Sequence, residues 1–509
     1  MRWSLCTLIL ITSCAHQPAP SPPRPVRIAT ADALAILALD RELSSSPEGA
    51  PRRFEAEWEL VQALERAELL NLTFIYAVRL VRTPLHPHQV DGLETLARLQ
   101  ELRQDDFLIP SLFNTEFQKP SPPALSAPAM ARVAWLRARI AFRRGKHADA
   151  LALCAQVPAG APVFARTQYL KAIMLTDVRV EGGAGAGEAA TILERLAGPA
   201  DPKQEGGEQV REQALLALGR LAYGQKRWAD SVRWYEQAAQ LAPIRARALF
   251  EQSFAFMQQR DWVSALARLR SGEVRNSGLT EASLTEAMVL HYSGDPAAAE
   301  VALEQARHGP ETVDWNEAEP ARAADAWRTG RGVAPEPLAL AREDRRLARL
   351  FASIESFELE RRLVLDTAEW RGTGTAASFA QFLTQNLETL QKTSAILAHG
   401  EFKELQRFSS FHAQAADLVG IEVALARRDL NGAIGCAERT LTALQGEGGP
   451  VASDLMFRLA ALKQARAEVL TGAEAAQERL EVAQLIARIL GGDQTWPRLE
   501  EARRFGDLP

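Results

Sequence analysis

The chain has 509 residues, of which 47% are apolar and 24% are charged, a balance typical of a folded globular protein. Its net charge of −5 at pH 7 predicts no basic surface for nucleic acid. Length alone allows several domains.

Residues 1–13 have the features of a secretory signal. Arg2 precedes the apolar run Trp3–Ile11, which is too short to cross a membrane as a helix. The run ends at Ile11-Thr12-Ser13-Cys14, which resembles the cleavage box of bacterial lipoproteins. Ile11 stands where that family usually has leucine. The resemblance implies cleavage before Cys14 and acylation of its thiol and new amine, which anchors a protein stably. The alternative is an ordinary signal with an incidental cysteine.

A proline-rich tether follows at residues 14–29, with five prolines between Ala15 and Pro25. Ala15, rather than aspartate, follows the cysteine, and by resemblance to lipoproteins this favours the outer membrane. The sequence therefore predicts a body that lies in the periplasm and is held by a lipid anchor.

Residues 30–130 are predicted to form an N-terminal helical region. Helical spacing of apolar residues indicates helices near Ala31–Leu43, Phe54–Val81 and Gln89–Gln104. The proline-marked segment Asp106–Pro128 is predicted to be a loop.

A repeat of 34 residues dominates the middle of the chain. Starting at Glu212, Ala246 and Thr280, similar residue types recur at the same offsets; they include Gly219, Trp228, Tyr235, Ala238, Trp262, Ala265, Gly294, Asp295 and Ala299. This pattern resembles the tetratricopeptide repeat family, whose unit is a pair of helices. The resemblance implies an all-α fold, an α-solenoid in which helix pairs stack on one another.

Further repeats flank these three. Ala131–Pro162 and Ala165–Pro199 fit the same template, so the solenoid is predicted to span residues 131–329. A linker is predicted at 330–337, and a helical, repeat-like region at 338–491 includes a turn at Asp429. Residues 492–509 form a tail.

Motifs for catalysis or cofactor binding are weak in this sequence. His86-Pro-His88 is a histidine pair without further ligands, and a metal site needs three or four. The glycine run 182–187 lacks the Gly-Lys-Ser/Thr of a phosphate loop. Cys154 and Cys436 are predicted to be core thiols. We therefore expect no cofactor, no metal and no enzymatic activity.

The repeat resemblance also implies a binding site, because the first helix of each repeat lines a concave groove in that family. The template positions give the predicted groove residues Trp135, Arg139, Phe142, Leu216, Arg220, Tyr223, Phe250, Phe254, Met257, Leu284, Met288 and His291. Exposed aromatic and methionine side chains on a groove suit a peptide or helix of a partner protein. The alternative is that the protein's own N-terminal helices or the Asp106–Pro128 segment fill the groove.

The sequence thus predicts a scaffold or assembly factor for an envelope complex, of the kind found in outer-membrane assembly, pilus, secretion or gliding machinery. Two alternatives remain at this point: a cell-wall-modifying enzyme with a repeat arm for targeting, and a solenoid that binds a small ligand.

Overall fold

The computed structural model describes residues 27–491, apart from 104–107, 118–123, 177–184, 278, 280, 308–314, 316, 332, 334–337, 339–340, 342–344 and 445–449. All regular elements in this part of the chain are helices, which confirms the predicted all-α fold. The predicted signal peptide, most of the tether, residues 182–184 of the glycine run, most of the 330–337 linker and the tail lie outside the described residues.

The chain divides into two compact units. Unit 1 extends to Ala255 and resumes over residues 312–403. Its helices are α1 (Thr30–Ser45), α2 (Pro51–Arg66), α3 (Leu70–Arg82), α4 (Gln89–Arg103), α5 (Leu108–Glu116), α6 (Ala127–Arg143), α7 (His147–Ala155), α8 (Phe164–Thr176), α9 (Ala186–Leu196), α10 (Gly207–Gly224), α11 (Trp228–Ala238), most of α12 (Arg245–Gln258), α17 (Pro320–Thr329), α19 (Arg345–Asp366) and the first part of α20 (Gly374–Ala426).

Unit 2 comprises residues 256–311 and the chain from residue 404 onward. It contains the end of α12, the later part of α20, and α13 (Trp262–Leu269), α14 (Gly272–Arg275), α15 (Glu281–Tyr292), α16 (Pro296–Arg307), α21 (Leu430–Ala443), α22 (Pro450–Val469) and α23 (Gly472–Gly491).

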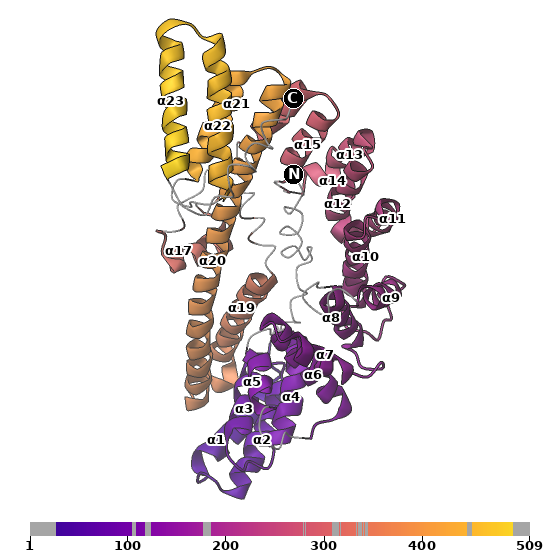
Figure 1. The fold of residues 1–509 in the computed structure, drawn as a ribbon. Coiled ribbons are helices and arrows are strands. Elements are labelled where there is room, and N and C mark those ends of the chain that lie inside the picture. The colour runs from indigo at the N-terminus through magenta and orange to yellow at the C-terminus, as the bar shows by residue number, and fades with distance from the viewer. Residues whose placement is uncertain are drawn as a thin grey trace. The chain divides into compact units, whose positions relative to one another are not determined.

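Helices that are neighbours in sequence pack as pairs, as Figure 1 shows for α6 to α11. The predicted period is confirmed by the helix ends: α10, α12 and α15 end 34 residues apart, and α11, α13 and α16 begin 34 residues apart. The turn of each pair contains one residue with a left-handed backbone, namely Lys226, Arg260 and Gly294. Consecutive helical hairpins with one fixed period define a helical repeat protein.

Aspartate caps fix where the second helices begin. Asp261 accepts a hydrogen bond from the Ser264 N–H at 3.0 Å, and Asp295 does the same for Ala298. Asp429 caps α21 through the Gly432 N–H at 2.9 Å, and Arg428 before it has a φ of 61°. The turn between α20 and α21 is therefore built like the turns of the central repeats, as the sequence predicted.

Close packing inside the repeats explains the small residues of the template. In α10, Gly219 lies against the ring of Tyr235 on α11, and its carbonyl accepts a hydrogen bond from the Ser231 hydroxyl at 2.9 Å. Ala265 of α13 and Ala299 of α16 are fully buried. Side chains larger than these would hold the two helices of a pair apart.

Two predictions for the N-terminal region are wrong. The segment Phe54–Val81 is not one helix, because the chain breaks between α2 and α3 at Glu68, which has a φ of 58°. The segment Asp106–Pro128 is not simply a loop, because it contains α5. Within that segment Phe113 and Phe117 are buried, and α5 packs against α4 and α6. Apolar burial therefore outweighs the prolines as a determinant of this segment.

Later helices of unit 1 pack against its first helices. The Trp370 indole donates a hydrogen bond to the Ala33 carbonyl at 2.8 Å, and the Thr375 hydroxyl donates to Asp40 at 2.7 Å. Phe379 of α20 meets Tyr76 of α3 edge to face, with ring centroids 5.8 Å apart. Residues 345–403 thus complete the core of the N-terminal helical region.

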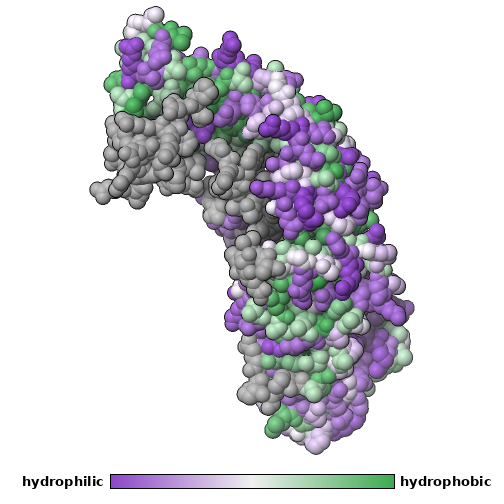
Figure 2. Space-filling view, turned by 45° about the vertical axis from the view of Figure 1, so that its right-hand side comes forward, coloured by the Kyte–Doolittle hydropathy of each residue, from purple (hydrophilic) through white to green (hydrophobic). Residues whose placement is uncertain are grey.

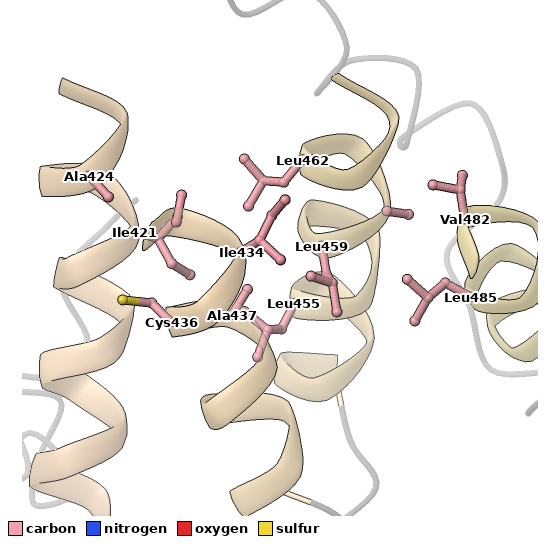
Figure 3. Close-up of a cluster of buried hydrophobic side chains, with 12 residues drawn as sticks. Ile421, Ala424, Ile434, Cys436, Ala437, Leu455, Leu459, Leu462, Val482 and Leu485 are labelled. Carbon is pink, nitrogen blue, oxygen red and sulfur yellow. The ribbon is translucent and has the colours of Figure 1, made fainter. Parts of the chain in front are cut away.

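Unit 2 has its own apolar core. Figure 3 shows Ile421 and Ala424 of α20, Ile434 and Ala437 of α21, Leu455 and Leu459 of α22, and Val482 and Leu485 of α23 in one cluster. Cys436 belongs to this cluster and is buried, as the sequence predicted, and so is Cys154 in unit 1. Burial raises the pKa of the Cys154 thiol to about 11, which is typical of a structural and unreactive cysteine.

Candidate functional site

The predicted groove residues fall into both units, and their surroundings decide what each can offer a partner. On the face drawn in Figure 2, hydrophilic and hydrophobic residues are interspersed. This face therefore offers individual apolar side chains rather than one broad apolar surface.

Four of the predicted groove residues are core residues. Leu216 of α10 and Phe250 of α12 are fully buried, and Trp135 of α6 and Met257 of α12 are nearly so. Leu216 packs in the cluster that joins α10, α11 and α12. These side chains therefore hold the repeats together and present little surface to a ligand.

Arg220 of α10 is committed to an internal ion pair. Its guanidinium donates two hydrogen bonds to the carboxylate of Glu251 on α12, at 2.8 and 2.5 Å, and Arg247 donates a third at 2.6 Å. Although burial opposes ionisation, these two arginines lower the pKa of Glu251 to about 2. The charge of Arg220 is thus used to join α10 to α12.

Other predicted residues of unit 1 are half-buried. Phe142 of α6 meets His147 edge to face at 5.6 Å, and it packs on the core of α6, α7 and α8. Tyr223 of α10 meets Trp228 at 4.9 Å, and Phe254 of α12 meets Phe250 at 5.2 Å. Each ring is oriented by one neighbouring ring and keeps part of its surface accessible. Phe142, Tyr223 and Phe254 are accordingly aromatic contacts that the predicted groove residues of unit 1 can offer.

Arg139 of α6 is also half-buried, and its guanidinium carbon lies 4.9 Å from the centre of the Trp135 ring. This distance is typical of a cation–π contact. The structure thus brings together Trp135 and Arg139, two residues that the sequence predicted for the same helix face.

In unit 2, Leu284, Met288 and His291 of α15 are half-buried. Leu284 packs on the core between α15, α16 and α20. The His291 ring lies 5.2 Å from that of Tyr292, which is exposed and stacks at 6.1 Å on Trp262. Met288 of α15 is thus an accessible apolar group, and so is Tyr292 of α15, which stacks on Trp262 of α13.

Sequence reasoning missed Arg166 of α8, whose guanidinium carbon lies 5.7 Å from the same Trp135 ring. The signal was available: Arg166 occupies, in the repeat that begins at Ala165, the same template position as Arg132 in the preceding repeat. Reading that position in every repeat would have found it.

The described residues give no sign of a metal or membrane-spanning site. No group of three histidine, cysteine, aspartate or glutamate side chains among them could hold a metal ion. Within the same part of the chain, every helix is too short or too polar to cross a bilayer. His86 and His88 instead bind carboxylates, with Glu57 3.2 Å from His86 and Asp91 2.7 Å from His88.

The fold therefore defines a class, a helical repeat protein built of sequential helix pairs. No family model matches the sequence, and no curated protein does either. A solved structure of Naa15/Naa10 bound to HypK-THB is similar over 88% of this chain and 86% of that one, with 13% identity and a TM-score of 0.23. A circular tandem repeat protein with novel repeat topology is similar over 94% and 98%, with 15% identity and a TM-score of 0.12. Both scores are low, so the assignment rests on the helices themselves.

Proposed function

We propose that this protein is a scaffold or assembly factor that binds another protein through the first helices of its repeats. The observation that supports this most is the set of half-buried apolar side chains on those helices: Tyr223 and Phe254 in unit 1, and Met288 in unit 2. Rings and thioethers that are oriented by packing and still accessible are suited to a peptide or helix partner.

We further propose that the repeats are of the tetratricopeptide kind. The 34-residue spacing of the helix ends supports this, as does the burial of Gly219, Ala265 and Ala299 at the template positions for small residues. In such an array the first helices repeat the same face, so a partner is read by several repeats together.

The proposed location is the periplasmic side of the outer membrane. The support is in the sequence alone: the short apolar run, the Ile11-Thr12-Ser13-Cys14 box and the prolines that follow it. Acylation of Cys14 would anchor the protein, and the partner would then be another envelope protein of an assembly, pilus, secretion or gliding complex.

One observation favours a second candidate, the binding of a small ligand. Unit 2 contains a cleft of about 450 Å³ between α16, α20 and α21, within the size range of ligand pockets. Glu300 and Leu303 lie on one side, and Gly435, Cys436 and Arg439 lie on another. We propose no enzymatic activity, because the motifs for catalysis or cofactor binding in the sequence are weak.

Co-purification from solubilised native membranes tests the proposed function. Wild-type protein should recover one envelope protein in a fixed ratio, identified by mass spectrometry. Recovery of a bound small molecule and no protein would favour the second candidate, and recovery of neither would contradict both.

A further inference from the structure

The turn between α3 and α4 presents a leucine to solvent. Leu85 is 94% exposed, and Pro84 before it and Pro87 after it are exposed as well. These three residues form the apolar tip of the turn. A side chain that is exposed to this degree contributes almost no apolar burial to the fold, so core packing does not explain why a leucine stands here.

The backbone of Leu85 is a second, independent observation. The His86 N–H donates to the Thr83 carbonyl at 3.3 Å, and Leu85 has a φ of 61°. With proline in second place and a positive φ in third place, residues 83–86 have the pattern of a type II turn, whose third residue is ordinarily glycine or asparagine. A leucine in that place is strained, because its Cβ crowds the neighbouring backbone. The other described residues that combine a positive φ with a side chain are charged and exposed: Glu68, Lys226, Arg260 and Arg428.

The apolar tip is held in place by its neighbours in the turn and by α2. His86 is buried, and its ring lies 3.2 Å from the carboxylate of Glu57 on α2. The same ring accepts a hydrogen bond from the His88 N–H at 3.1 Å. The Gln89 side-chain amide donates to the Thr83 carbonyl at 2.6 Å. These contacts fix both ends of the turn, so its leucine loses little further freedom when it binds.

We propose that Leu85 is a docking residue, which enters an apolar socket in a partner protein. A leucine that is neither buried nor matched to its own backbone is explained if another molecule buries it. A single convex side chain between prolines suits a concave, apolar socket. This inference rests on the proposed function, because it names a second contact with the same partner.

The carboxylates near the apolar tip favour a protein socket over a lipid surface. Glu55 lies 3.2 Å and Asp91 lies 2.7 Å from the ring of His88, and their side chains are 52% and 47% exposed. At a lipid surface these two carboxylates would lose part of their hydration, which is costly. Around a socket they remain in the solvated, polar rim that surrounds the buried centre of a protein interface.

The test compares variants at position 85 of the full chain, with the protein that co-purifies from native membranes as the probe. Leu85→Asn should raise the dissociation constant about tenfold or more, as expected when a buried leucine side chain is lost. Its thermal midpoint should equal or exceed that of wild type, because asparagine adopts a positive φ more readily than leucine does. Leu85→Met should bind within about threefold of wild type, because it keeps an apolar side chain on the same backbone.

Leu34→Asn is the matched control, since Leu34 is 52% exposed on α1 of the same unit. It should leave the affinity unchanged. Unchanged affinity for Leu85→Asn, or equal losses for Leu85→Asn and Leu85→Met, would overturn the proposal. A lower thermal midpoint for Leu85→Asn would show that the leucine acts within the fold, and would also overturn it.

Two further outcomes separate this inference from its alternatives. In a Cys14→Ser background, binding to vesicles of phosphatidylethanolamine and phosphatidylglycerol that Leu85→Asn abolishes, with unchanged affinity for the partner, would assign the apolar tip to lipid and overturn the proposal. If Phe254→Glu weakens binding of the partner and Leu85→Asn does not, only this inference is wrong. If no protein co-purifies with wild type, the proposed function fails and this inference fails with it.

Discussion

The carboxylate of Glu360 on α19 caps the helix that begins beside Asn71. It accepts hydrogen bonds from the backbone N–H groups of Asn71 at 2.9 Å and Leu72 at 2.8 Å, and from the Asn71 side-chain amide at 2.9 Å. These N–H groups lie in the first turn of α3 and have no partner within that helix. Residues 289 apart in sequence are thus joined by a buried charge at a helix N-terminus, where the helix dipole favours it.

Glu360→Ala should therefore lower the free energy of unfolding by about 3 kcal/mol, because it leaves two buried N–H groups without acceptors. Glu360→Gln should lose about half as much, since its amide oxygen can still accept. Urea unfolding of both variants checks this, with Glu388→Ala on the exposed side of α20 as the control. Equal losses for Glu360→Ala and Glu388→Ala would show that the cap contributes nothing.

Gly219 provides a test of the repeat packing. A methyl group there would lie 2.6 Å from the Tyr235 ring, so Gly219→Ala should destabilise the protein by about 1–3 kcal/mol through overpacking. Gly224→Ala, in the same helix and with open space around it, should be neutral or stabilising by up to about 1 kcal/mol because alanine favours the helix. Thermal unfolding compares the two variants. Stabilisation by both would mean that the α10–α11 crossing tolerates a larger residue.

The two histidines between α3 and α4 should respond to pH with opposite signs. Burial lowers the pKa of His86, and Glu57 offsets this only in part. Burial also opposes the charge on His88, but hydrogen bonds to Asp91 and Glu55 outweigh it and raise that pKa. The His88 contribution to stability is full below its unfolded pKa of about 6.5 and is lost as pH rises through the folded value. The His86 contribution is present above about 6.5 and is lost as pH falls through its lowered folded value.

The measurement is the difference in unfolding free energy between wild type and each single glutamine variant, across about pH 5 to 9. The unfolding free energy of wild type should exceed that of His88→Gln by an amount that shrinks toward high pH. It should exceed that of His86→Gln by an amount that shrinks toward low pH. Differences that do not vary with pH would show that neither ring changes its protonation on folding.

Several features of the fold were predictable from the sequence because they are local. The cap at Asp429 depends on residues within one turn, and Gly219 meets Tyr235 on the second helix of the same repeat, so residue types at fixed offsets within a 34-residue period predict both. The break at Glu68 was not predictable in this way. A non-glycine residue adopts a left-handed backbone there, and the apolar pattern continues across it.

The sequence did not predict the long-range contacts. Nothing near Asn71 in sequence indicates that Glu360 would cap it, and the contact of Trp370 with Ala33 depends on the same return of the chain. The burial of the predicted groove residues could not be predicted from the sequence either. Its template positions predict which helix face a residue occupies, but they do not predict what covers that face. Phe250 is therefore buried while Phe254, one turn later, is half-exposed.

The membrane anchor remains a prediction from the sequence. Cys14→Ser should remove the acyl mass and release the protein from the membrane fraction after a salt wash. Intact-mass analysis of protein from native membranes checks this directly. Wild-type protein without any lipid, or Cys14→Ser protein that still carries it, would contradict the proposed anchor.

The central claim is that the first helices of the repeats bind a partner protein, and one affinity measurement tests it most directly. The dissociation constant of the complex with the co-purified partner should rise about thirtyfold for Phe254→Glu, which corresponds to about 2 kcal/mol. It should be unchanged for Val263→Glu, in which the replaced side chain is 80% exposed on a second helix. Equal thermal midpoints for the two variants would show that both are folded. Unchanged affinity for Phe254→Glu would contradict the claim.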